Sequence, residues 1–578
     1  MTTGIFADIV MMNGVVYTAD SQDTVYQAVA VKGEKILFVG SNEQIVAYSN
    51  DDTEIIDLQG KMVIPGLIDS HIHPPGIALT ELYEVQLFGI NTLDGYLAAV
   101  RNFIQQHPDA KAVFGQGWLW SAFTGDDLNK GPRKEYLDAV APDIPIILRA
   151  MDGHSWWVNS RALVLSGITT ETQAPEGGVI EKDAVSGELW GTVKESAISL
   201  VMQPQYTLEQ YIQAMVAFQS KMHSFGITGM LAILGRFMPL ILQALSHLGQ
   251  QGQLALHVRG AIMVQPQDDL DGQLEAIGDL QTEYHSANFR ITTAKFFADG
   301  VVEGGTSYLL APYTLATGKG PAYYGRFLWN GGRLDEAFAA ANQRGLQIHV
   351  HSIGDGATRK VLDAFAAARL LAPAGDFRNT ITHLQLVDQG DIERFKQLQV
   401  IASVQPYWHF KGPNWWHNVD YRLLGARAEY EYPLQSFIDA GVPIISSSDY
   451  PITPVPNPLF AIETGVTRNI FDGRVYGVED ITDRDDERYL LNKAERVTVA
   501  AMLRSFTING AYALFVEQET GSLEAGKQAD MVVLDQNLFA INPVDIDKVK
   551  VLRTYFAGRL VYHRAATGES HEATGAYG

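Results

Sequence analysis

Two histidines separated by a single residue, His71 and His73, have the spacing of a metal-binding pair. They end a mostly apolar run over 63–74, VIPGLIDSHIHP, which is typical of a buried strand. Side chains alternate between the two faces of a strand, so residues two apart point the same way. Both imidazoles are therefore expected to project from one end of one strand, and neutral imidazole is a good ligand for zinc and related ions. Packing of two buried histidines is the alternative.

The composition limits which ligands such a site can use. The chain has 578 residues and no cysteine, which excludes disulfides, thiolate ligands and a cysteine nucleophile. Any metal must therefore be bound by histidine, by Asp or Glu, or by an oxygen attached to lysine. The formal net charge of −23 argues against nucleic acid and anionic membrane surfaces as partners. A small-molecule substrate is the expected partner.

The chain also lacks the signals of membrane insertion and secretion. No uninterrupted apolar run reaches the roughly 18 residues that a membrane-spanning helix needs. The N-terminal segment has neither the basic region nor the cleavage site of a signal peptide. We therefore expect a cytoplasmic protein, and the sequence leaves open whether it forms a homo-oligomer.

The two ends of the chain are rich in short strands. Residues 1–62 contain apolar runs separated by turn signals such as Asn13-Gly14, and further runs lie within 512–565. Neither end has enough strands for a stable pair of sheets by itself. We therefore predict that 1–62 and 512–565 together form one composite β-sandwich. The polar tail, 566–578, is expected to be loosely held.

Between these ends, apolar strands alternate with amphipathic helices. The strand that ends at His73 is followed by seven more candidates: 226–231, 254–262, 290–297, 346–351, 380–385, 400–405 and 443–449. This alternation predicts the α/β class and a (β/α)8 TIM-like barrel over 63–511, with a doubly wound sheet as the alternative. Residues 76–206 do not continue the alternation. We assign them to a long insertion after the first strand, expected to form a cap over the active site.

Polar residues recur at the ends of the predicted strands, where barrel enzymes carry their active sites. Lys295 belongs to the fourth strand and Asp449 ends the eighth. The fifth carries both His349 and His351, of which only His351, nearer the strand end, is expected to reach a metal. Together with a histidine of the sixth strand, these residues complete the set of candidate metal ligands: His71, His73, Lys295, His351, His383 and Asp449.

Lys295 is the least expected residue of this set. A lone lysine at a strand end more often reaches solvent, but Lys295 follows an apolar strand and precedes Phe296 and Phe297. A buried lysine needs either a shifted pKa or a partner. Carbamylation of its amine by CO2 would turn Lys295 into an anionic oxygen ligand able to bridge two metal ions. We expect zinc, as one or two divalent ions.

Several motifs carry a resemblance to a known family. The stretches PGLIDSHIH, KFFADG, HVHSIGD, THLQ and SSSDYP, with the closing GSLEAGKQADMVVLD, resemble the amidohydrolase superfamily and are most similar to its family 3. The similarity runs from Ala7 to about His563. It implies a metal-bearing barrel with a composite β-sandwich that hydrolyses C–N bonds in amides. The resemblance does not determine whether there is one ion or two. In a two-ion form, one ion would be held by His71, His73, Lys295 and Asp449, and the other by Lys295, His351 and His383.

The resemblance also implies a reaction. We expect metal-activated hydroxide to cleave a linear amide of the N-substituted formamide or N-acyl amine type. Asp449 would act as general base and then as general acid. Cyclic-amide hydrolysis, a phosphotriesterase or lactonase at the same site, and a non-catalytic regulator that binds small molecules remain alternatives. Deaminases of the superfamily resemble one another in a glutamate three residues after the strand-five histidine. Gly354 stands at that position here, which disfavours deamination.

The substrate contacts are sought among aromatic and polar residues of the loops. Of nine tryptophans, four lie in the WLW and HSWW motifs of the insertion and three follow the seventh strand. They are candidates for a pocket that takes an apolar or aromatic substituent, with simple packing as the alternative. The candidate substrate contacts are His154, Gln116, Trp118, Trp157 and Trp408.

Overall fold

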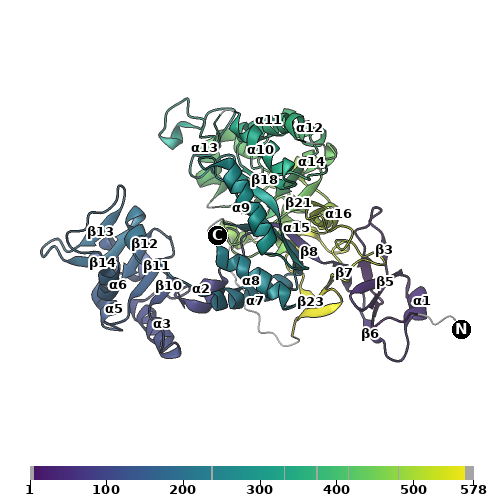
Figure 1. Ribbon diagram of the computed structural model, residues 1–578, viewed down its shortest axis with the longest axis horizontal. Helices are drawn as coiled ribbons and strands as arrows, with labels where there is room; N and C mark the ends of the chain where they lie inside the picture. The colour runs from purple at the N-terminus through teal and green to yellow at the C-terminus, as the bar shows by residue number, and fades with distance from the viewer. Residues whose placement is uncertain are drawn as a thin grey trace. The chain divides into compact units, whose positions relative to one another are not determined.

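The computed structural model describes residues 5–235, 238–330, 332–372, 375–413, 415–479 and 481–565, and these fall into two compact units (Figure 1). Unit 1 combines the residues up to Gly76 with those from Met215 onward, and unit 2 is Ile77–Ala214. The predicted tail, 566–578, lies outside the described residues. Within the described ranges, no helix combines the length and the apolar character that crossing a membrane requires.

Unit 1 is built around an eight-stranded sheet in which all neighbouring strands are parallel. In chain order, which is also their order in the sheet, the strands are β8 (Leu67–Ile72), β15 (Ile227–Leu234), β16 (His257–Met263), β17 (Phe289–Phe297), β18 (Gln347–Ser352), β19 (Thr380–His383), β20 (Ile401–Val404) and β21 (Ile444–Ser446).

The first and last strands of this sheet meet. The Ser70 hydroxyl donates to the Ser446 carbonyl at 2.8 Å, and the Asp449 amide donates to the His71 carbonyl at 2.9 Å. The sheet is therefore a nearly closed barrel, and the predicted eight-stranded parallel barrel is confirmed. The sequential strand order distinguishes it from a doubly wound sheet.

Helices alternate with the barrel strands, as right-handed parallel crossovers require. They are α7 (Leu208–Ser224), α8 (Pro239–Gln250), α9 (Leu270–Glu283), α10 (Arg333–Gln343), α11 (Asp355–Leu371), α12 (Gln389–Gln397), α14 (Gln435–Asp439), α15 (Pro458–Thr467), α16 (Val499–Ser505) and α17 (Ile508–Ala513). Helix α7 begins with a capping box. The Gln210 amide donates to Thr207 Oγ1 at 3.3 Å, and the Thr207 amide donates to Gln210 Oε1 at 2.9 Å.

The chain ends form two further sheets, with strand orders β5-β4-β1-β6 and β24-β23-β22-β7-β2-β3. Their strands are β1 (Ile9–Met12), β2 (Val15–Tyr17), β3 (Val25–Tyr26), β4 (Ala28–Lys32), β5 (Lys35–Gly40), β6 (Glu54–Asp57), β7 (Met62–Pro65), β22 (Met531–Leu534), β23 (Val551–Phe556) and β24 (Arg559–His563). Met11 and Val29 of the first sheet share a hydrophobic cluster with Val63 and Met531 of the second. Burial of these apolar faces holds both ends of the chain together.

The segment 63–74, predicted as one interrupted strand, is two strands in different sheets. Strand β7 belongs to the sheet of the chain ends and β8 to the barrel, with Gly66 between them. The Gly66 amide donates to the Asp530 carbonyl at 2.8 Å, and a Cβ at this position would lie 2.1 Å from Thr228 Oγ1. Only glycine therefore fits at the point where the chain passes from one sheet to the other.

Unit 2 has its own sheet, with strand order β13-β14-β12-β11-β10-β9. Its elements are α2 (Ala78–Tyr83), β9 (Val85–Gln86), α3 (Leu93–Gln106), β10 (Val113–Trp118), α4 (Asp126–Lys130), α5 (Lys134–Asp138), β11 (Ile146–Ala150), β12 (Ser155–Val158), α6 (Ser160–Leu165), β13 (Val179–Lys182) and β14 (Leu189–Lys194). Unit 2, Ile77–Ala214, overlaps the segment 76–206, whose assignment as an insertion stays a prediction. Its role as a cap stays a prediction.

Candidate metal centre

The six predicted ligands lie in or just beyond five barrel strands: β8, β17, β18, β19 and β21. Five of their side chains are buried, and the exception is His73, whose side chain is 37% exposed. Access from solvent to this group of residues is therefore on the side of His73.

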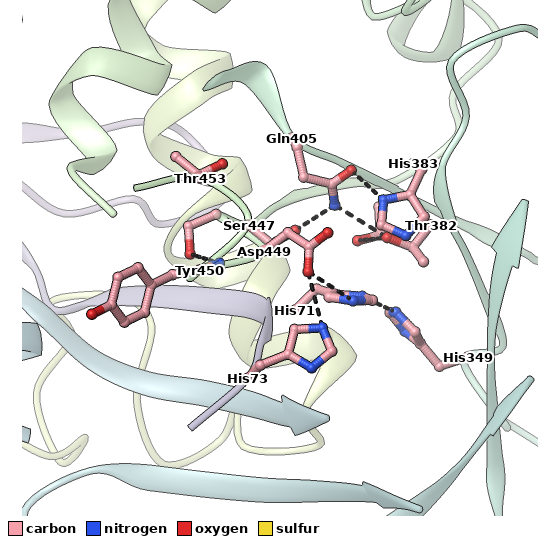
Figure 2. A network of polar contacts seen from close by, with 12 residues as sticks. His71, His73, His349, Thr382, His383, Gln405, Ser447, Asp449, Tyr450 and Thr453 are labelled. Carbon is pink, nitrogen blue, oxygen red and sulfur yellow. Dashed lines mark hydrogen bonds and ion pairs between the residues drawn. The ribbon is translucent and has the colours of Figure 1, made fainter. Parts of the chain in front are cut away.

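His71, His73 and Asp449 form the tightest part of the group (Figure 2). Asp449 Oδ1 lies 3.4 Å from His71 Nε2 and 3.0 Å from His73 Nε2, yet it makes no hydrogen bond within the described residues. Tetrahedral zinc bonds of about 2.1 Å place neighbouring ligand atoms roughly 3.4 Å apart. The three side chains therefore have the spacing that one divalent ion requires.

Asp449 is held in place from the first strand of the barrel. The carboxylate of Asp69 in β8 accepts the Ser448 amide at 3.1 Å and the His71 amide at 3.2 Å. The φ of Asp449 is 56°, in the left-handed region that non-glycine residues adopt at a cost of about 1–3 kcal/mol. Sequence reasoning missed Asp69, although a carboxylate inside the apolar run of this strand was a signal.

A glutamine determines which nitrogen of His383 is free. Gln405 Nε2 donates to Thr382 Oγ1 at 3.1 Å and to Ser447 Oγ at 2.7 Å, so its Oε1 is the acceptor that faces His383 Nδ1 at 2.9 Å (Figure 2). His383 therefore carries its proton on Nδ1, and Nε2 remains available for a metal. Gln405, at the end of the seventh predicted strand, was also missed.

His351 presents its other nitrogen. Its Nε2 lies 3.0 Å from the Gly300 carbonyl oxygen, which can only accept a hydrogen bond. The proton is therefore on Nε2, and Nδ1 is the available ligand atom. The rings of His351 and His383 are adjacent, with centroids 4.5 Å apart.

Lys295 carries a buried amine at the end of an apolar strand. Its Nζ is completely buried, lies 5.0 Å from the Phe297 ring centroid and has no hydrogen-bond partner among the described residues. Burial lowers the pKa of Lys295 to about 7, although the nearby Asp449 charge opposes this. A substantial fraction of the amine is thus neutral near pH 7, and the neutral amine is the form that reacts with CO2. An unpaired buried amine is costly, so this residue fits a ligand role.

Trp408 is the predicted substrate contact that lies beside a candidate ligand. Its ring is stacked near His383, with centroids 6.0 Å apart and an interplanar angle of 19°. The indole N–H donates to Thr453 Oγ1 at 3.0 Å, which holds the ring against the loop that follows Asp449.

The four other predicted substrate contacts belong to unit 2. Trp118 and Trp157 are completely buried in its core and donate hydrogen bonds to backbone carbonyls. Neither ring has surface free to contact a substrate, so packing, the alternative explanation, accounts for both. His154 is exposed and its Nδ1 lies 3.0 Å from Glu195 Oε2. Gln116 donates to Gln86 Oε1 at 3.5 Å, and for His154 and Gln116 a substrate role stays a prediction.

A parallel barrel with histidines, a lysine and an aspartate at its strand ends is an arrangement typical of a metal-dependent hydrolase. The chain matches the amidohydrolase family over residues 54–562 and belongs to this family. The resemblance found in the sequence is thereby confirmed. The protein is a metal-dependent hydrolase of the amidohydrolase type, which acts on carbon–nitrogen bonds.

Three similar proteins extend over most of the chain. The protein LONG AFTER FAR-RED 3 of Arabidopsis thaliana is 29% identical, covering 97% of this chain and 92% of its own. The N-substituted formamide deformylase of Arthrobacter pascens is 27% identical, covering 97% of this chain and 99% of its own. A crystal structure of an uncharacterized metal-dependent hydrolase from Pyrococcus furiosus has a TM-score of 0.70 and 25% identity, covering 93% of this chain and 99% of its own.

Proposed function

We propose that the protein hydrolyses a linear amide, of the N-substituted formamide or N-acyl amine type, to a carboxylic acid and an amine. The observation that carries this proposal is the carboxylate of Asp449, whose Oδ1 faces Nε2 of both His71 and His73 and has no hydrogen-bond partner among the described residues. The similarity to an N-substituted formamide deformylase over nearly the full length of both chains supports the linear amide as substrate.

The proposed cofactor is zinc, as one or two ions held by the six predicted ligands. A bound divalent ion would lower the pKa of a water molecule and polarise the amide carbonyl. The available nitrogens of His351 and His383 and the unpaired amine of Lys295 support a second ion next to the first. As a carbamate, Lys295 would be an oxygen ligand common to both.

Asp449 is the proposed proton carrier. Its carboxylate accepts the proton that water loses as the water oxygen bonds to the carbonyl carbon. The same group then gives this proton to the nitrogen as the C–N bond breaks, which returns Asp449 to the carboxylate form. The hydrogen bonds that Asp69 accepts from the backbone amides of Ser448 and His71 support this role, because they restrict the residue before Asp449 and the histidine that Asp449 faces.

Two further proposals concern the substrate and the fold of the chain ends. The half-buried ring of Trp408 beside His383 supports a substrate with an apolar or aromatic substituent. The shared hydrophobic cluster of the two sheets at the chain ends supports their assignment as a composite β-sandwich.

The test is the substitution Asp449→Asn in zinc-loaded protein. We expect kcat for the best linear amide to fall by about 10²–10⁴-fold, because the amide side chain cannot accept and return a proton. The circular dichroism spectrum should be unchanged. The matched control is Asp391→Asn on α12, a buried carboxylate that binds Arg359 and Arg394 and no predicted ligand. Near wild-type turnover in Asp449→Asn would remove Asp449 from the mechanism.

The substrate assay should present N-substituted formamides and N-acyl amines together with cyclic amides, lactones and aryl phosphotriesters. Hydrolysis confined to the last three classes would overturn the linear-amide proposal. Metal analysis by mass spectrometry after purification without chelators checks the cofactor. Absence of bound metal would favour a non-catalytic binding protein.

A further inference from the structure

A completely buried histidine that is not a predicted ligand lies against one that is. His349 Nε2 is 2.8 Å from His71 Nδ1, and the ring centroids are 4.9 Å apart (Figure 2). His349 shares a face of β18 with His351 but lies two residues farther from the carboxyl end of the strand. It is therefore one layer deeper in the barrel than His351 and level with Lys295 of the neighbouring strand.

The contact between His71 and His349 decides which nitrogen of His71 can bind a metal. Between two neutral imidazoles, one proton occupies the N–H···N contact. With that proton on His71 Nδ1, the Nε2 lone pair of His71 faces Asp449 and is available. With the proton on His349 Nε2, the neutral His71 ring carries its own proton on Nε2 and cannot be a ligand through that atom.

We propose that His349 is a positioning residue for the metal centre. Its Nε2 accepts the Nδ1–H of His71 and so holds the His71 ring in the orientation and tautomer that direct Nε2 toward an ion. The inference rests on the proposed role of His71 as a ligand. Gln405 makes the equivalent contact with His383, so two buried polar side chains each accept the Nδ1–H of a different ligand.

Among the described residues, no other hydrogen bond of the His349 side chain competes with its contact to His71. Its other nitrogen, Nδ1, has no hydrogen-bond partner within the described residues. A buried polar ring is costly to retain unless its contacts compensate. Among the described residues, the one hydrogen bond of the His349 side chain is to His71, a predicted ligand. For packing alone, an apolar side chain would serve better at this position.

The test compares His349→Leu with His349→Gln. Leucine removes the acceptor, whereas the glutamine amide oxygen can reach the position of the imidazole Nε2. We expect His349→Leu to raise the zinc dissociation constant about 10–100-fold, measured by competition with a chelator, and His349→Gln to raise it less than tenfold. The visible absorption spectrum of the cobalt-substituted protein should change in His349→Leu and resemble the wild type in His349→Gln.

The matched control is His223→Leu, which removes a buried histidine of α7 whose Nε2 lies 2.8 Å from the Ala255 carbonyl oxygen. It should leave the zinc affinity unchanged. Wild-type zinc affinity in His349→Leu would overturn the inference, as would equal losses in the leucine and glutamine variants. If His349→Leu does not fold, His349→Asn, whose shorter amide withdraws the acceptor, replaces it under the same criteria. Absence of zinc binding by the wild type would instead overturn the proposed function, and this inference with it.

Discussion

Lys295 is the residue on which the number of metal ions in the proposed centre depends. Its amine is buried at the C-terminal half of β17, next to His349 of the neighbouring strand, and it has no hydrogen-bond partner in the described part of the chain. A lysine in this position is an unpaired cation, a neutral amine or a modified ligand. Because burial lowers its pKa to about 7, the neutral form increases as the pH rises through that value.

We predict that the wild type, prepared with bicarbonate, binds a second divalent ion more readily at about pH 8 than at about pH 6, because carbamylation needs the neutral amine. Lys295→Met should bind at most one ion per chain, as measured by mass spectrometry of the metal content. Lys411→Met is the control, since Lys411 is another buried lysine but binds Glu429 and the Glu487 carbonyl. Equal metal content in the wild type and Lys295→Met would show that Lys295 is no ligand.

At the scale of elements, helix α15 meets the segment after β22 through two acidic side chains. Glu463 is buried in α15, and its Oε2 accepts the Asp547 amide at 3.0 Å. Burial, reinforced by the nearby Asp547 charge, raises the pKa of Glu463 to about 9. Burial also raises the pKa of Asp547. The folded protein therefore holds a proton at this contact that the unfolded chain releases at lower pH.

The sign of the pH dependence follows from this raised pKa. The contribution of Glu463 to stability is fully present below its unfolded pKa of about 4.3 and is lost as the pH rises toward about 9, by at most about 1.4 kcal/mol per pH unit. We predict that Glu463→Gln, which stays neutral, makes the free energy of unfolding less dependent on pH over this interval. Urea denaturation at several pH values measures the effect. An unchanged slope in the variant would contradict the assignment.

At the scale of the whole chain, Asp530 joins the C-terminal strands to the barrel and to the N-terminal segment of unit 1. Its carboxylate accepts hydrogen bonds from Thr520 Oγ1 at 2.6 Å and the Ala557 amide at 2.7 Å, and lies 2.8 Å from Nε2 of His257 in β16. Its carbonyl accepts the Gly66 amide. Burial alone would raise the pKa of Asp530, but His257 and the hydrogen-bond donors outweigh it and lower this pKa.

We predict that Asp530→Ala lowers the free energy of unfolding by about 3–5 kcal/mol, because it leaves His257 and two hydrogen-bond donors, Thr520 Oγ1 and the Ala557 amide, without their buried partner. Since the pKa of Asp530 is lowered in the folded state, its stabilisation is present above the unfolded pKa of about 3.9 and is lost at lower pH. Asp545→Ala, which removes an exposed pair with Lys548, should cost less than about 1 kcal/mol. Similar losses in the two variants would show that Asp530 does not join these parts.

The sequence by itself determined which segments form the strands of the central sheet and which six residues are candidate ligands, but it left a doubly wound sheet as an alternative to the barrel. These properties are encoded locally, because apolar runs, helix periodicity and the position of a polar residue at the end of a strand are visible within a short window. The alternation of side chains correctly placed His71 and His73 at one end of β8, and His349 and His351 on one face of β18.

Only the tertiary structure decided what each of these residues contacts. His71 and His349 are 278 positions apart, and Asp69 and Ser448 are 379 apart, so no local pattern predicts either hydrogen bond. The burial of Trp118 and Trp157 in the core of unit 2 likewise depends on how distant strands pack. A strand's pattern indicates the face on which a side chain lies, whereas the partner across the barrel is determined by closure of the whole sheet.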